Sequence, residues 1–133
     1  MSIPRFPLLA GPTPIQAAPR LREALGGSAR CPTILIKRDD LAGPFLGGNK
    51  SRKLEYVVAD ALAKGATTLV TVGGTQSNHA RMTAAAARLA GLDCHLILNT
   101  TSATADPQGT LLLHGLLDPG VPLLPPAPPP PQT

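Results

Sequence analysis

Apolar residues along the chain recur at helical spacing in two segments. The first begins at Ser51 and is closed by Gly65, and the second is closed by Gly91. The residues at helical spacing are Leu54, Val57, Val58, Ala61 and Leu62 in the first segment and Met82, Ala85, Ala86, Leu89 and Ala90 in the second. This periodicity predicts two amphipathic helices, each with one apolar face.

Short aliphatic and β-branched runs flank these helices. The runs are Thr33–Lys37, Thr68–Val72 and Cys94–Leu98, and each is typical of a buried strand. The resulting order is strand, helix, strand, helix, strand. Because helical crossovers return the chain parallel to the preceding strand, this order predicts an α/β fold, an open parallel sheet with flanking helices.

The two ends of the chain carry weaker patterns. Residues 1–20 contain five prolines and are expected to form an extended arm, followed by a short helix around Pro19 to Leu25. Residues 109–117 fit one more short helix. Half of the sixteen prolines lie from Asp118 onward. Since proline suits neither a ladder nor a helix interior, we expect a disordered or polyproline II tail there.

Composition and charge narrow the classes of function. Aromatic residues make up 2% of the chain, too few for base stacking, and the basic residues behind the net charge of +4 are scattered. Nucleic-acid binding is therefore not expected. The spacing of Cys31 and Cys94 is not that of a metal-binding pair. No apolar stretch is as long as a transmembrane helix, and none has the form of a signal peptide. We expect a cytoplasmic protein with no metal site and no membrane contact.

The first segment with chemistry-bearing residues is Gly47-Gly48-Asn49-Lys50, directly before the first predicted helix. A glycine pair lets the backbone turn sharply and approach a ligand. A helix N-terminus favours an anion, and a lysine held beside it can attack an aldehyde. Taken alone, however, a lysine at this position is most often a solvated residue of the first helical turn.

The stretch from Gly43 to Ser51 also resembles a phosphate-binding P-loop. In that motif the lysine directly follows the last glycine, whereas Asn49 intervenes here. No hydrophobic strand leads into Gly43 either. Nucleotide binding is therefore not expected.

The second segment is Gly73-Gly74-Thr75-Gln76-Ser77-Asn78-His79, between a predicted strand and a predicted helix. Open parallel sheets bind ligands at the carboxyl ends of their strands, where this segment lies. Taken singly, Ser77 is more often just a helix cap, and His79 is more often a surface residue.

Together the two segments resemble a known family. Residues 46–92 contain the paired motifs G-G-N-K-x-R-K-L-E and Q-S-N-H, which are far more specific at this separation than either is alone. They resemble the D-cysteine desulfhydrase and 1-aminocyclopropane-1-carboxylate (ACC) deaminase group of fold-type II, tryptophan synthase β-like enzymes, which use pyridoxal 5′-phosphate (PLP). The similarity extends back through residues 36–41 to Thr13-Pro14 and fades after about Leu117.

The resemblance implies roles for individual residues. Lys50 would form the Schiff base with PLP and move the α-proton of the substrate. Asn78 would donate a hydrogen bond to the 3′-oxygen of PLP. Ser77 would act near the Cα and carboxylate of a small amino-acid substrate, and Asn78 and His79 would help to hold that carboxylate. A carboxylate at a helix N-terminus is physically favourable.

The reaction implied is α,β-elimination, most directly the conversion of D-cysteine to pyruvate, sulfide and ammonia. Ring opening of ACC is the alternative within the group. The histidine after Ser77-Asn78 favours the desulfhydrase, because the deaminases usually have glutamine there.

Members of this group are about twice as long or longer. The resemblance implies that residues 1–48 form the arm and a strand of the large PLP domain and that residues 49–117 form part of the small α/β domain, while 118–133 resemble no part of the group. The loop for the PLP phosphate and the group facing the pyridine nitrogen would lie in the second half, and neither is found here. We expect the chain to be truncated and inactive or weakly active. A non-catalytic role stays open, as does a homo-oligomer or association with a full-length homologue.

Overall fold

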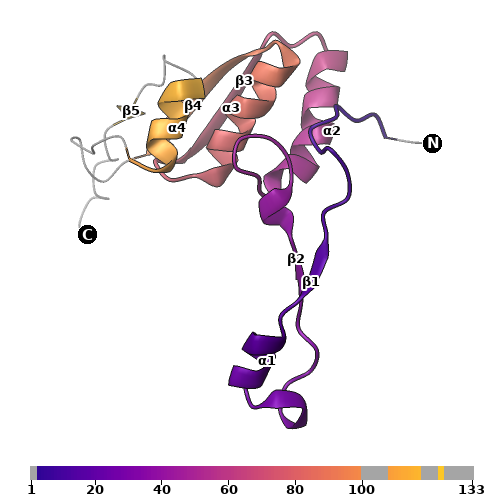
Figure 1. The fold of residues 1–133 in the computed structure, drawn as a ribbon. Coiled ribbons are helices and arrows are strands. Elements are labelled where there is room, and N and C mark those ends of the chain that lie inside the picture. The colour runs from indigo at the N-terminus through magenta and orange to yellow at the C-terminus, as the bar shows by residue number, and fades with distance from the viewer. Residues whose placement is uncertain (1–2, 100–107, 118–122, 125–133) are drawn as a thin grey trace, which may run out of the picture.

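The computed structural model describes residues 3–99, 108–117 and 123–124 (Figure 1). Its elements are β1 (Ile15–Ala17), α1 (Pro19–Ala24), β2 (Leu35–Lys37), α2 (Lys50–Ala63), β3 (Thr68–Gly74), α3 (Asn78–Ala90), β4 (Asp93–Asn99), α4 (Thr110–Leu117) and β5 (Leu123–Leu124). Short 3-10 turns occupy Gly27–Ala29 and Asp39–Leu41. None of the helices in these residues is long and apolar enough to cross a membrane.

The main body is built on a parallel sheet in the order β3–β4–β5. The register between β3 and β4 runs from Thr68 opposite Asp93 to Gly74 opposite Asn99. Helix α3 packs against both of these strands and lies between α2 and α4 (Figure 1). The predicted α/β class, with a parallel sheet and flanking helices, is confirmed.

The main core lies between α3 and one face of the sheet. Ala80, Ala84 and Ala87 of α3 are fully buried, and they belong to one cluster with Leu96 and Leu98 of β4. Because alanine side chains are short, the helix backbone can approach the strands closely. A second buried cluster joins α2 to α3 and to the N-terminal segment, and its members are Leu8, Leu54, Val58, Met82 and Ala86. A chain with almost no aromatic residues thus obtains its core from small and aliphatic side chains.

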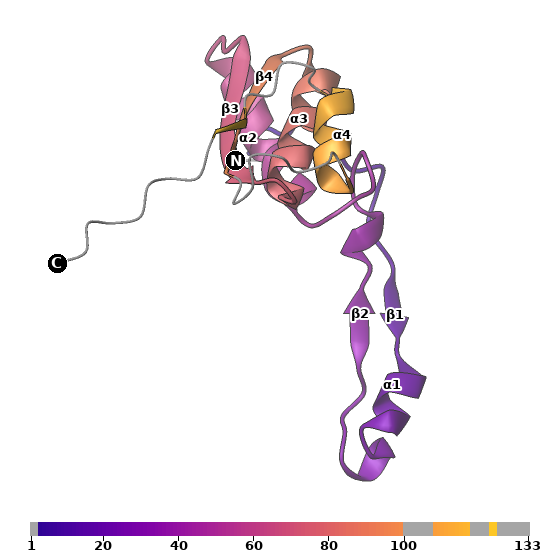
Figure 2. The ribbon, with the colours of Figure 1, turned by 90° about the vertical axis from the view of Figure 1, so that its left-hand side faces the viewer.

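The strand β2 does not belong to this parallel sheet. It pairs antiparallel with β1, with Ile15 opposite Lys37 and Ala17 opposite Leu35, and the hairpin extends away from the main body together with α1 (Figures 1 and 2). The expectation that residues 33–37 form the first strand of the parallel sheet is therefore wrong. All six residues of the pair are exposed, so no apolar alternation identified β1 within the proline-rich arm.

The prediction for the proline-rich end is also wrong at two residues. Leu123–Leu124 pair parallel with Leu98 and Asn99 of β4, forming β5. These two leucines lie between Pro122 and Pro125, and a residue before proline favours extended backbone. A two-residue edge strand avoids placing proline in the ladder. The remainder of the predicted tail lies outside the described residues.

A buried carboxylate binds the N-terminal segment to α2. Glu55 is 2% exposed, and its Oε1 accepts hydrogen bonds from the amides of Leu8 and Leu9, each at 3.1 Å. Its Oε2 lies 2.8 Å from the guanidinium of Arg5. The backbone carbonyl of Glu55 also accepts from the amide of Phe6 at 2.8 Å. Four donors of one short segment therefore converge on one residue of α2.

A second polar contact holds the start of α2 against the base of the hairpin. Arg52 donates to both carboxylate oxygens of Asp39, at 2.9 and 2.6 Å, and to the hydroxyl of Thr13 at 3.0 Å. The hydrogen bonds from Arg52 lower the pKa of Asp39 to about 2. Because a bidentate pair fixes direction as well as distance, it sets the position of the helix start that carries Lys50.

Replacing Glu55 by alanine is expected to lower the free energy of unfolding by about 2–4 kcal/mol, because the amides of Leu8 and Leu9 lose a buried acceptor. Urea denaturation of the purified chain measures this change. Asp60→Ala, on the exposed side of the same helix, is the control and is expected to change the value by less than about 0.5 kcal/mol. Equal effects of the two substitutions would contradict the anchoring role of Glu55.

Candidate functional site

The backbone before Lys50 passes through a run of residues with positive φ. The angles are 55° at Phe45, 69° at Leu46, 65° at Gly47 and 135° at Gly48. A Cβ atom on Gly47 would lie 1.9 Å from the carbonyl oxygen of Asp40, so glycine is required there. The glycine turn expected from the sequence is present, but it starts two residues earlier, at non-glycine positions that cost about 1–2 kcal/mol each.

Lys50 is the first residue of α2 and is partly buried. Its Nζ donates to Oδ1 of the neighbouring Asn49 at 3.0 Å. None of the ion pairs within the described residues involves Lys50. Among the described residues, no carboxylate holds its amine, which therefore stays accessible to an aldehyde.

The N-terminus of α3 follows directly on the carboxyl end of β3. Ser77 caps the helix, and its Oγ accepts from the amide of Ala80 at 3.2 Å. A Cβ on Gly73 would lie 2.7 Å from the side chain of Ser77, so this glycine permits the close approach. The amides of Asn78 and His79 have no acceptor among the residues that the structure describes. Two free N–H groups at a helix N-terminus are suited to bind an anion.

The ring of His79 lies between α2 and the edge of β3. Its Nε2 is 3.2 Å from the hydroxyl of Thr71, and it lines a hollow of about 180 Å³ beside Lys53 and Leu54. Burial, followed by the charges of Lys53 and Lys50, lowers the pKa of His79. The imidazole is thus favoured in its neutral form. The ring of His79 is engaged with Thr71, whereas its backbone amide lies in the first turn of α3.

Arg81 joins the two predicted site segments. Its guanidinium donates to the carbonyl oxygens of Phe45 and of Gly47, the latter at 3.2 Å, and to Oδ1 of Asn78 at 3.1 Å. The side chain is almost fully buried, with 4% of the residue exposed. Sequence reasoning missed this residue. The signal that could have found it is an arginine directly before the predicted apolar face of α3, which begins at Met82.

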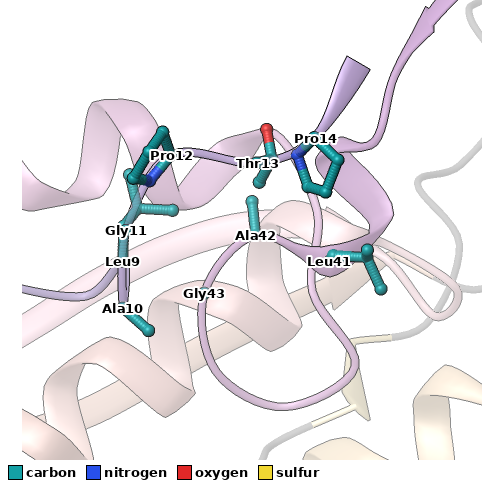
Figure 3. A pocket seen from close by; sticks show the side chains of 9 residues that line it. All are labelled: Leu9, Ala10, Gly11, Pro12, Thr13, Pro14, Leu41, Ala42 and Gly43. Atoms are coloured by element: carbon teal, nitrogen blue, oxygen red, sulfur yellow. The ribbon is translucent and has the colours of Figure 1, made fainter. Parts of the chain in front are cut away.

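A hollow of about 280 Å³ lies elsewhere, between residues 9–14 and 41–43 (Figure 3). Figure 3 shows aliphatic and proline side chains around it, and Thr13 is the one lining residue with a polar side chain. The Thr13 hydroxyl already pairs with Arg52 and Asp39. None of the predicted site residues lines this hollow. Within the described residues, no group of His, Cys, Asp and Glu could hold a metal ion.

The groups around Lys50 and the α3 N-terminus fit PLP and an amino acid. An aldehyde needs an amine outside an ion pair, and Lys50 offers one. A phenolic oxygen needs a hydrogen-bond donor, and the amide side chain of Asn78 can supply it. A carboxylate needs free N–H groups, which Asn78 and His79 present.

Comparisons with known proteins identify the family of the chain. The family described as pyridoxal-phosphate dependent enzyme matches residues 7–114. An ACC deaminase of Rhizobium leguminosarum bv. viciae is 56% identical over 118 residues, which is 85% of this chain and 34% of the relative. A D-cysteine desulfhydrase of Salmonella paratyphi B is 50% identical over 104 residues, 77% of this chain and 30% of the relative.

A solved structure agrees as well. The crystal structure of an ACC deaminase homologue superimposes with a TM-score of 0.79 at 41% identity, covering 92% of this chain and 35% of that chain. The resemblance inferred from the paired motifs is confirmed. The chain spans about a third of the length of these relatives.

Gly47→Ala is expected to lower the free energy of unfolding by at least ~2 kcal/mol, because alanine resists positive φ and its Cβ would clash with Asp40. Gly74→Ala is the matched control, since a Cβ there meets nothing within 4 Å. We expect it to change the value by less than about 0.5 kcal/mol. Urea denaturation measures both variants, and a well-tolerated alanine at position 47 would refute the described loop conformation.

Proposed function

The chain belongs to the pyridoxal-phosphate dependent enzyme family, and we propose that it binds PLP through Lys50 and acts on a small amino acid. One observation carries the proposal: Arg81 connects the loop before Lys50, through Gly47, to Asn78 at the N-terminus of α3. This contact holds an amine and a set of anion-binding amides on neighbouring segments. When bound, PLP would supply the electron sink for cleavage of bonds at the substrate Cα.

The residues of the site divide into binding and proton-transfer roles. Lys50 would bind the aldehyde carbon of PLP and, once released, take the α-proton of the substrate. The Asn78 side chain would donate to the 3′-oxygen of PLP, and the amides of Asn78 and His79 would hold the substrate carboxylate. Ser77 uses an oxygen lone pair to accept from Ala80, so its hydroxyl hydrogen remains free to donate toward the substrate.

We propose D-cysteine as the substrate: α,β-elimination would release sulfide and 2-aminoacrylate, and hydrolysis of the latter by water would give pyruvate and ammonia. Two observations support this choice: the Salmonella relatives bear the name D-cysteine desulfhydrase, and histidine follows Ser77-Asn78. ACC is the second candidate, because the rhizobial relative at 56% identity bears the name of its deaminase. We place the reaction in the cytoplasm.

We further propose that these 133 residues do not supply the whole site. The hairpin region, residues 1–48, would belong to a large domain and residues 49–117 to part of a small one. The groups that face the PLP phosphate and the pyridine nitrogen would come from other polypeptide. The chain alone would then bind PLP weakly, and a non-catalytic role beside a full-length homologue is the alternative.

The first test is chemical trapping of PLP on the purified chain. After incubation with PLP and reduction with borohydride, mass spectrometry of the peptides is expected to locate the adduct on Lys50, with saturable dependence on PLP concentration. Lys50→Ala is expected to lose the saturable adduct, whereas Lys64→Ala, an exposed lysine near the end of the same helix, is expected to keep it. Adducts spread equally over the surface lysines would contradict the proposed role of Lys50.

The second test is turnover. With PLP present, the chain is expected to release pyruvate from D-cysteine at less than about 0.1 s⁻¹, against roughly 10 s⁻¹ for a typical enzyme. Any release from ACC, measured as 2-oxobutyrate, is expected to be slower still, and Lys50→Ala is expected to abolish both. A typical rate would refute the proposal that other polypeptide completes the site, and faster turnover of ACC would favour the deaminase.

A further inference from the structure

The guanidinium of Arg81 is buried without a carboxylate. It is held by three oxygen acceptors, two backbone carbonyls of the 45–48 loop and Oδ1 of Asn78. None of the ion pairs within the described residues includes Arg81. Burial lowers its pKa, but an arginine remains charged at neutral pH. A buried charge of this kind is costly unless its hydrogen bonds are made, so the acceptors must stay in place.

The loop and the arginine therefore depend on each other. The positive φ angles of Phe45 and Leu46 are unfavourable for residues with side chains. The carbonyls of Phe45 and Gly47 reach Arg81 in this conformation. Hydrogen bonds from a charged donor are roughly twice as strong as neutral ones, which offsets the strain of the loop. Lys50 follows this loop within three residues of Gly47.

The same contact assigns the orientation of the Asn78 amide. A guanidinium carries only donors, so the Asn78 atom that faces it has to be the oxygen. The NH₂ group is then directed away from Arg81, and its hydrogens remain available to an acceptor on a ligand. The orientation of this amide thus follows from a neighbour that touches neither the substrate nor the cofactor.

We propose that Arg81 is a positioning residue for PLP binding, which holds the loop before Lys50 and presents the Asn78 NH₂ group to an acceptor oxygen of the cofactor. The inference rests on the proposed function, in which Lys50 binds PLP. It is specific to arginine, because three acceptors in different directions require the guanidinium fork, and a lysine ammonium on a flexible stem cannot fix all three.

The first measurement needs no cofactor. The amide of Gly48 donates to the carbonyl of Ala42 at 2.9 Å, so its hydrogen exchange reports the closed loop. Arg81→Lys is expected to raise this exchange by about tenfold or more, while amides of β4 stay unchanged and show that the fold is kept. The matched control is Arg88→Lys, at an exposed position of the same helix. It is expected to leave the exchange of both the Gly48 amide and the β4 amides unchanged.

The second measurement is the dissociation constant for PLP, with adducts on Lys50 quantified by borohydride trapping. Arg81→Lys is expected to weaken binding by about tenfold, and Arg88→Lys to leave it unchanged. Asn78→Asp keeps an acceptor for Arg81 but removes the NH₂ donor. It is expected to leave the exchange of Gly48 unchanged and still weaken PLP binding by about tenfold. This variant remains informative even if Arg81→Lys fails to fold.

The outcomes separate this inference from the proposed function. If the unmodified chain shows no saturable adduct on Lys50, both are overturned. If it binds PLP and Arg81→Lys binds equally well, only the positioning role is overturned. If Arg81→Lys speeds the exchange of Gly48 but leaves the PLP affinity unchanged, Arg81 is a purely structural residue, and the positioning role is likewise overturned. Unchanged affinity in Asn78→Asp would refute the assigned orientation of the amide.

Discussion

The close packing of α3 on the sheet is the constraint on which the rest of the structure depends. Ala80 and Ala84 are fully buried in one cluster with Leu96 and Leu98 of β4, so a helix of small residues lies near the strands. Because Gly73 has no side chain, Ser77 at the start of α3 can also lie close to the end of β3. The N-terminus of α3 is thereby fixed at the carboxyl end of the sheet, where its free amides can meet a ligand.

Polar contacts then hold the loop before Lys50 against α3. Arg81 binds the loop before Lys50 to α3, and Arg52 binds the first turn of α2 to Asp39. Glu55 attaches the N-terminal segment to the same helix. With 2% aromatic residues, the chain has few large side chains to pack these segments together. Directional hydrogen bonds to and from these charged side chains hold the segments in place instead.

Two apolar surfaces show where further polypeptide would add most burial. Val70 and Val72, on the outer face of β3, are 63% and 56% exposed. In the hairpin, Ile15 and Leu35 are 64% and 61% exposed. A two-stranded hairpin is at best marginally stable in water by itself. These surfaces agree with our proposal that other polypeptide completes the site, because covering them would stabilise both the hairpin and the sheet.

The sequence by itself determined the main helices, strands β3 and β4 and the family, because period and motif are local properties of the chain. The helical period predicted α2 and α3, and the residues around Lys50 and Ser77 identified the family. The partner of β2, the ring position of His79 and the contacts of Arg81 were decided only by the tertiary structure. Each depends on which groups the folded chain brings together, as when the Arg81 side chain reaches the carbonyl of Gly47 across 34 positions. No local pattern of side chains encodes such a contact.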